Sequence, residues 1–339
     1  MSGLSLSLIR EASAYLEGKV RHTPLEESPE LSERLGVPVW LKLEFLQTTG
    51  SFKLRGAWFR LSRLTAGERQ RGVATSSAGN HGQGLAHASR ELGISATVYV
   101  PAGASDAACR RMRALGADVV RSSHRGYDDT EAWAREEARV AGKPFISPFD
   151  DDAVMAGNGG SLAAEILADL PDVKGFVVPV GGGGLGAGLS YYASETVADP
   201  WIAACQLAAS PALQLSLERG EAVTRLPAVE TAAGGLEGGI GRRTFEILRH
   251  RVTQVVLAGE DEILAAVRWL LDHHRYLVEP SAAVTVAACL SGKIANLAGP
   301  VAVILSGRNI DVGTARRALE PPSPGELPET TPGSSRDTG

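Results

Sequence analysis

The alternation of short apolar runs with amphipathic stretches constrains the fold of this chain more than any other feature. Because strands that alternate with helices usually pair in parallel, the pattern predicts an α/β fold with mostly parallel open sheets and helices on both faces. The first series predicts strands over 72–76, 96–100 and 118–120 and helices over 81–92 and 107–115. The second predicts strands over 176–180, 201–207 and 301–305 and a helix over 186–196. We therefore expect two lobes, with ligands in a cleft beyond the carboxyl ends of the strands.

Length, charge and cysteine content narrow the class of protein. The 339 residues, 44% of them hydrophobic, are enough to bury a large core. The net charge of -5 comes from interspersed basic and acidic side chains, so we expect a small-molecule ligand and neither nucleic acid nor a membrane. Cys109, Cys205 and Cys289 lie far apart in the chain, which fits the reducing cytoplasm. No apolar run approaches the roughly 18 residues of a spanning helix.

A lysine between apolar neighbours is the first candidate for chemistry. Lys53 lies between Phe52 and Leu54, after the sequence Thr-Thr-Gly-Ser. Desolvation lowers the pKa of such a lysine and leaves a neutral amine that can attack a carbonyl. The alternative is an exposed lysine in the first turn of a helix, because Thr-Thr-Gly-Ser is also a natural capping sequence.

A segment of small polar residues follows the predicted strand over 72–76. Ser77, Asn80 and His81 lie where this strand gives way to the next helix. Free backbone N–H groups at a helix N-terminus, together with short hydroxyl and amide side chains, form a site for a carboxylate. An ordinary helix cap, with His81 exposed in the first turn, is the alternative.

Four consecutive glycines, Gly181 to Gly184, connect a predicted strand to a predicted helix. Glycines allow successive N–H groups to converge on a phosphate, and the following helix adds its dipole. The run also matches the dinucleotide pattern G-x-G-x-x-G, but Gln206 stands where a dinucleotide site needs an acid at the end of the next strand. A phosphate cradle therefore fits better than a nicotinamide site or a simple tight turn.

The strand predicted over 301–305 ends at Ser306. Its hydroxyl can meet a ring nitrogen beyond the sheet, although an ordinary turn explains it equally well. Taken together and in this order, Gly-Ser-Phe-Lys, Ser-Ala-Gly-Asn-His, the tetraglycine run and Ser-Gly-x-Asn resemble the fold-type II pyridoxal-phosphate family of threonine and serine dehydratases. That family also contains serine racemase and threo-3-hydroxyaspartate dehydratase, and the likeness covers about residues 10–315.

The resemblance implies a two-lobed architecture like that of the tryptophan synthase β chain. Residues 1–70 and 151–320 would form the large cofactor-binding domain, and 71–150 the small mobile substrate domain. The segment 321–339 is rich in Pro, Ser, Thr, Glu and Gly, and we expect it to be a disordered tail. A homodimer is the general expectation for such an enzyme.

The resemblance also implies roles for the motif residues toward pyridoxal 5'-phosphate. Lys53 would carry the cofactor as a Schiff base and remove the α-proton, while Phe52 packs against the ring. Asn80 would bind the pyridine hydroxyl, and Ser306 would face the pyridine nitrogen. The phosphate would be bound by Gly181, Gly182, Gly183, Gly184 and Leu185. The substrate carboxylate would be held by Ser77, Asn80 and His81.

The implied reaction is the removal of water and then ammonia from L-threonine, L-serine or a related β-hydroxy amino acid. The rival within the family is an amino-acid racemase, which needs a proton donor opposite the lysine. Racemases of this type carry serine where this chain has Ala78, so a dehydratase is favoured, with 3-hydroxyaspartate dehydratase as a further alternative.

Three departures from the family pattern stand out. Gly234 replaces an aspartate that helps to bind a divalent cation, so we expect no metal. Arg308 replaces a glycine and places a cation near the predicted cofactor site. The family's Gly-Gln-Gly-Thr segment is altered in residues 157–161, and the sequence alone does not explain this change.

Overall fold

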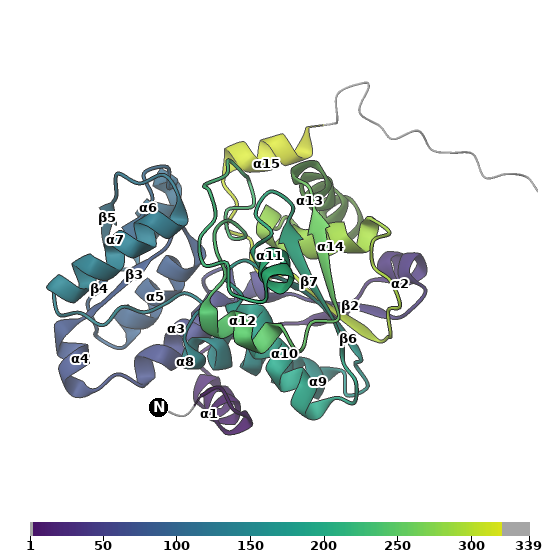
Figure 1. Ribbon diagram of the computed structural model, residues 1–339, viewed down its shortest axis with the longest axis horizontal. Helices are drawn as coiled ribbons and strands as arrows, with labels where there is room; N and C mark the ends of the chain where they lie inside the picture. The colour runs from purple at the N-terminus through teal and green to yellow at the C-terminus, as the bar shows by residue number, and fades with distance from the viewer. Residues whose placement is uncertain (1–2, 321–339) are drawn as a thin grey trace, which may run out of the picture.

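The computed structural model describes residues 3–320 and confirms the α/β fold with mostly parallel strands (Figure 1). The tail predicted over 321–339 lies outside the described residues. The larger sheet has the order β1-β2-β9-β6-β7-β8, in which only the β1–β2 pair is antiparallel. Its strands are β1 Leu25–Glu27, β2 Val39–Lys42, β6 Gly175–Pro179, β7 Trp201–Leu207, β8 Gln254–Ala258 and β9 Val301–Ile304.

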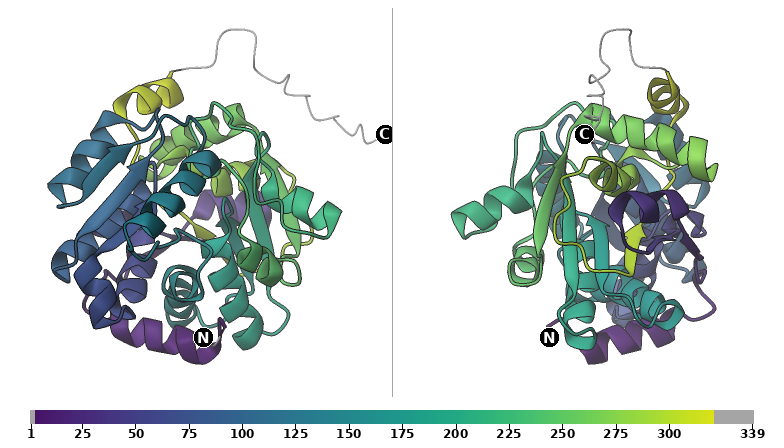
Figure 2. Two further views of the ribbon diagram at one scale, coloured as in Figure 1. Left: turned by 60° about the vertical axis from the view of Figure 1, so that its left-hand side comes forward. Right: turned by 90° about the vertical axis from the view of Figure 1, so that its right-hand side faces the viewer.

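A second, smaller sheet is parallel throughout and has the order β3-β4-β5. Its strands are β3 Val73–Ser76, β4 Ala96–Val100 and β5 Asp118–Arg121. The left view of Figure 2 shows its elements, coloured blue, to the left of the green elements of the larger sheet. This sheet lies within the predicted small domain, although the division into domains and the mobility of one of them stay predictions.

Helices occupy most of the remaining chain. The first half contains α1 Leu6–Leu16, α2 Pro29–Leu35, η1 Glu44–Leu46, α3 Lys53–Ser62, α4 Ala66–Arg71, α5 Asn80–Glu91, α6 Asp106–Ala114, α7 Tyr127–Val140, α8 Asp152–Met155, η2 Ala156–Gly160 and α9 Ser161–Asp169. The second half contains α10 Gly184–Thr196, α11 Ala212–Arg219, α12 Arg242–Leu248, α13 Glu260–His274, α14 Pro280–Leu290 and α15 Val312–Leu319.

Alternate residues of each central strand pack on opposite faces, as the two-residue period of a strand requires. In β6, Phe176 and Val178 join a buried cluster with α1, α9 and α10, whereas Val177 joins a second cluster with α13 and α14. In β4, Val98 packs toward α5 and α6, and Tyr99 packs toward α7. Both sheets are therefore covered on both faces, which explains their nearly continuous apolar runs.

Helix α3 connects the two halves of the core. Leu54 and Trp58 pack in the cluster of the smaller sheet, whereas Phe59 packs in a cluster of the larger one. Its Gly56 N–H has no partner within the first helical turn and donates instead to Asn158 Oδ1 in η2 over 2.8 Å. The altered segment 157–161 thus contacts the helix that begins with Lys53.

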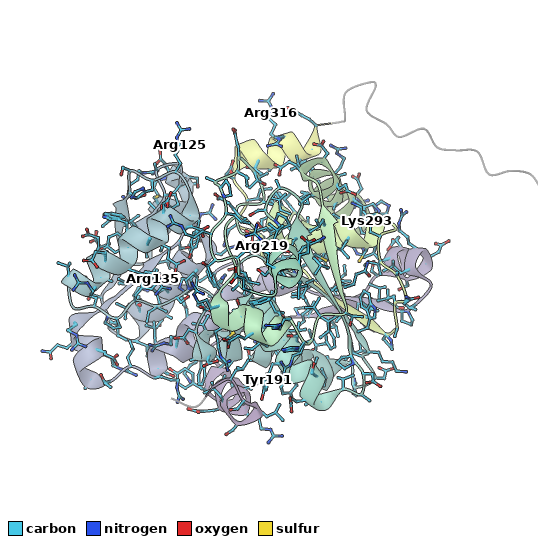
Figure 3. All side chains as sticks on the ribbon, in the orientation of Figure 1. Arg125, Arg135, Tyr191, Arg219, Lys293 and Arg316 are labelled. Atoms are coloured by element: carbon cyan, nitrogen blue, oxygen red, sulfur yellow. The ribbon has the colours of Figure 1, made fainter. Side chains whose placement is uncertain are left out.

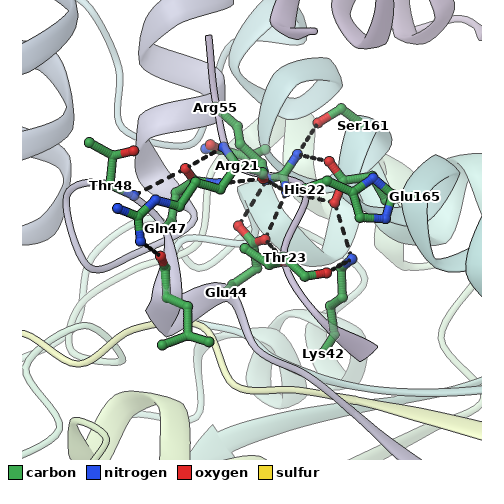
Figure 4. Close-up of polar contacts among 12 residues, drawn as sticks. Arg21, His22, Thr23, Lys42, Glu44, Gln47, Thr48, Arg55, Ser161 and Glu165 are labelled. Atoms are coloured by element: carbon green, nitrogen blue, oxygen red, sulfur yellow. Dashed lines mark hydrogen bonds and ion pairs between the residues drawn. The ribbon is translucent and has the colours of Figure 1, made fainter. Parts of the chain in front are cut away.

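A buried network of charged side chains fixes α3 against the larger sheet (Figure 4). The Arg55 guanidinium contacts Glu44 and Glu165 at 2.8 and 2.7 Å, and Lys42 lies 3.1 Å from Glu165. Arg55, Lys42 and Glu44 are fully buried. Burial alone would lower the pKa of Arg55, but the two carboxylates outweigh it and raise that pKa. Each buried charge therefore depends on its partners.

The outer surface carries charged side chains from many separate elements (Figure 3). The exposed Arg125, Arg219 and Arg316 come from the β5–α7 connection, α11 and α15. Within residues 3–320, no helix combines the length and the apolar character needed to cross a membrane.

Replacing Arg55 by methionine should strongly destabilise the fold. Arg55→Met keeps much of the side-chain volume but leaves Glu44 buried without its cation, so we expect a loss of about 3–5 kcal/mol in the free energy of unfolding. Chemical denaturation measures this quantity. Arg63 caps the C-terminus of α3 and forms an exposed ion pair with Glu11. Arg63→Met breaks this pair and should lower the free energy of unfolding by at most about 1 kcal/mol. Equal effects of the two substitutions would contradict the account.

Candidate active site

A cavity of about 370 Å³ lies beyond the carboxyl ends of β6 and β9, next to the first turns of α3 and α5. This volume suits a small ligand with a cofactor. The structure brings together every site residue predicted from the sequence: Phe52, Lys53, Ser77, Asn80, His81, Gly181, Gly182, Gly183, Gly184, Leu185 and Ser306 all line this cavity.

Lys53 is the first residue of α3 and is partly buried. Its Nζ donates to the carbonyl oxygen of Pro148 over 2.8 Å and lies 5.2 Å from the ring centroid of Phe52. Helix α5 approaches this point so closely that a Cβ on Gly84 would lie 3.1 Å from the carbonyl carbon of Lys53. Burial lowers the pKa of Lys53 to about 8, against the opposing charge of Glu279. A substantial fraction of the amine is therefore neutral in mildly basic solution.

The segment between β3 and α5 presents free donors to the cavity. The Ser77 hydroxyl accepts the N–H groups of Gly79 and Gly82, at 3.2 and 2.9 Å, and so fixes the turn. The N–H groups of Asn80 and His81 donate to no other described residue, so they remain available to an anion at the helix N-terminus. Burial, assisted by the charge of Lys53, lowers the pKa of His81 to about 3.

The tetraglycine run forms a second set of free donors, at the start of α10. Among the hydrogen bonds of residues 3–320, none uses the N–H groups from Gly181 to Leu185. Gly183 adopts a φ of 93°, which a residue with a side chain rarely tolerates. The loop is held in place because the Gly182 carbonyl accepts from the Thr244 hydroxyl over 2.8 Å. These donors and the α10 dipole suit a phosphate group.

Ser306 follows β9 on the same side of the sheet. Its carbonyl oxygen accepts the Phe52 N–H over 3.1 Å, which joins this strand end to the start of α3. Its side chain is buried and lines the cavity, and its hydroxyl forms no hydrogen bond with another described residue. The hydroxyl is therefore available to a ligand.

Glu279 is a site residue that the sequence analysis missed. Asn80 Nδ2 donates to its Oε1 over 2.6 Å, and the Asn309 N–H donates to its Oε2 over 3.1 Å. Burial raises the pKa of Glu279 to about 7, although these two donors and the charge of Lys53 oppose the rise. The available signal was a glutamate directly before Pro280, at the start of the almost wholly apolar α14.

The sequence also did not predict two other residues that line the cavity, Phe149 and Arg111, and it placed Arg308 there instead. Phe149 packs so closely on the glycine run that a Cβ on Gly182 would lie 2.3 Å from its ring. Arg111, from α6, lines the cavity. Arg308, which the sequence placed near the cofactor site, is exposed and does not line it. The arginine that lines this cavity is therefore Arg111 of α6, and not Arg308.

Comparisons with known proteins agree with this arrangement. Residues 16–307 match the family model described as "Pyridoxal-phosphate dependent enzyme". The chain is 40% identical to an L-threonine ammonia-lyase of Geobacter sulfurreducens, over 94% of this chain and 78% of the relative. Its structure is similar to threonine deaminase isoform 2 from Solanum lycopersicum (TM-score 0.83, 33% identity, 92% of each chain). It is also similar to maize serine racemase (TM-score 0.87, 27% identity, 94% and 97% of the chains).

Removing the charge of Glu279 should lower the pKa of Lys53 further. In Glu279→Gln the ammonium form loses a stabilising negative charge, so the neutral amine should prevail at lower pH. The pH dependence of Lys53 modification by an amine-selective reagent, followed by mass spectrometry, reports this change. Glu237→Gln, in the same cavity, should leave the midpoint pH of Lys53 modification unchanged. An unchanged or higher midpoint in Glu279→Gln would show that the two groups are not coupled.

Proposed function

The chain belongs to the pyridoxal-phosphate dependent enzyme family and is a lyase that uses this cofactor, and we propose that it acts on β-hydroxy amino acids. The substrate would be L-threonine, L-serine or a related compound, and the products a 2-keto acid and ammonium. The observation that carries the proposal is a partly buried lysine with a lowered pKa in the same cavity as two sets of unused backbone donors.

The residues present fit the cofactor. The unused N–H groups from Gly181 to Leu185 suit its phosphate, and the unpaired Ser306 hydroxyl suits its ring nitrogen. Phe52 would pack against the ring, Asn80 would bind the ring hydroxyl, and Lys53 would hold the cofactor covalently through its amine. When bound, pyridoxal phosphate withdraws electrons from Cα of the substrate and makes the α-proton removable.

The remaining steps fall to the side chains of this protein. The N–H groups of Asn80 and His81, with the Ser77 segment, would hold the substrate carboxylate and orient Cα. Lys53 Nζ would then accept the α-proton, for which a pKa near neutrality is favourable. The β-hydroxyl leaves with a proton as water, so the elimination consumes no net proton. The enamine that is released takes up one water molecule and gives the 2-keto acid and ammonium.

We also propose that the protein works as a homodimer in the cytoplasm. Symmetric dimers are the commonest assembly of soluble enzymes, which supports the first part. Cys109, Cys205 and Cys289 are buried free thiols, which suits a reducing compartment.

Replacing Lys53 by alanine should abolish both cofactor attachment and turnover. Lys53→Ala removes the amine that holds the cofactor and accepts the α-proton, so we expect keto-acid release to fall by at least about 10²–10⁴-fold. Coupled assays for keto acid and ammonium measure turnover, and visible absorbance reports attachment of the cofactor. Lys174→Ala, an exposed lysine outside the cavity, is the matched control. Retained turnover in Lys53→Ala would refute its assigned role.

A hydroxyl at position 78 should shift the outcome from elimination toward racemisation. Ala78 lines the cavity but has no proton to give, whereas reprotonation of Cα needs a donor within about 3 Å. Chiral chromatography of residual serine, beside pyruvate release, gives the ratio of the two reactions. We expect this ratio to rise in Ala78→Ser, and to stay low in Ala232→Ser, which adds a hydroxyl elsewhere in the cavity. Rapid racemisation by the native protein would favour a racemase instead.

A further inference from the structure

Arg111 is a cation at the cavity for which the proposed reaction has no use. It belongs to α6 and lines the cavity with part of its exposed side chain. Its Nη1 donates to Asn309 Oδ1 over 3.1 Å. No carboxylate of residues 3–320 forms an ion pair with it, whereas four other arginines between residues 71 and 150 each have one: Arg90, Arg121, Arg135 and Arg139. Four of its five N–H donors are therefore free for a ligand.

Three acidic side chains line the cavity: Glu237, Glu279 and Asp311. Glu279 accepts from Asn80 and Asn309, as described above. Asp311 accepts the N–H and the hydroxyl of Thr314 at 2.9 and 2.8 Å and so caps α15. Burial raises the pKa of Glu237 and so disfavours its charged form. None of the three carboxylates that line the described cavity forms an ion pair with Arg111.

Arg111 is also linked to the proposed carboxylate site at the start of α5. Asn309, which accepts from Arg111, donates through Nδ2 to Asn80 Oδ1 over 2.6 Å. The unused N–H groups of Asn80 and His81 lie at the far end of this short chain. One cavity thus offers an anion two separate positions besides the glycine run, a helix N-terminus and a guanidinium.

We propose that Arg111 determines substrate choice by binding a second carboxylate, on the side chain of the substrate. This inference rests on the proposed function, because it assigns the α-carboxylate to the start of α5. A guanidinium can bind a carboxylate through two parallel hydrogen bonds, which gives both affinity and orientation. The preferred substrate is then a β-hydroxy amino acid with an acidic side chain, such as 3-hydroxyaspartate, over L-threonine or L-serine.

Binding of unreactive acids to the holoenzyme tests this role without turnover. Isothermal titration compares succinate, a dicarboxylate, with butyrate, a monocarboxylate of the same chain length. Arg111→Gln should weaken succinate binding at least about tenfold, as expected for loss of a charge-assisted contact, and leave butyrate binding unchanged. Arg110→Gln removes an exposed arginine one residue away that does not line the cavity, and should change neither.

Steady-state kinetics provides the second readout. The native enzyme should have a higher kcat/KM for 3-hydroxyaspartate than for L-threonine. Arg111→Gln should lower the value for 3-hydroxyaspartate about 10- to 100-fold, mainly through KM, while that for L-threonine stays within about twofold. Arg111→Lys keeps the charge but loses the two parallel bonds. Its kcat/KM for 3-hydroxyaspartate should therefore lie between the values of the native enzyme and Arg111→Gln.

The outcomes separate this inference from the proposed function. If Arg111→Gln weakens succinate and butyrate equally, Arg111 binds the α-carboxylate, and the inference is wrong. Unchanged succinate binding in Arg111→Gln would overturn it as well. If the native enzyme releases keto acid from no hydroxy amino acid, the proposed function fails, and the titrations still decide whether Arg111 selects a dicarboxylate.

Discussion

The ion pairs of Arg55 with Glu44 and Glu165 are the interaction on which the site depends most. They hold α3 against the larger sheet from within the core, where a charge without a partner is very unfavourable. Lys53 lies two residues earlier on the same helix, so the position of its amine follows from this network. Asn158, which accepts from Gly56, and the close approach of α5 at Gly84 fix the same turn from two other sides.

Burial has opposite effects on the pKa values of Lys53 and Glu279, two ionisable groups that line the same cavity. It lowers the pKa of Lys53 to about 8 and raises that of Glu279 to about 7, because each charged form loses its hydration. Both groups therefore titrate near neutrality, as acid–base catalysis requires. Asn80, at the start of α5, and Asn309, after β9, both donate to Glu279, so the same hydrogen bonds join the electrostatics of the site to its shape.

Local patterns predicted most of the fold and the motif residues of the site. The strand over 96–100 coincides with β4, and the helices over 81–92 and 107–115 differ from α5 and α6 by one residue at each end. Glu279 and Arg111 were missed because neither belongs to a motif, and only the folded chain brings them to the cavity. Arg308 was misplaced because closeness in sequence to Ser306 does not fix the side-chain direction. The network around Arg55 joins residues more than 100 positions apart, beyond the reach of local patterns.

The central claim is that Lys53 holds the cofactor in this cavity, and covalent trapping tests it most directly. Borohydride reduction of the holoenzyme makes the link between lysine and cofactor permanent, and peptide mapping by mass spectrometry locates it. The account predicts the pyridoxyl group on the peptide that contains Lys53. A group on another lysine, or no trapped group in a protein that is catalytically active, would contradict it.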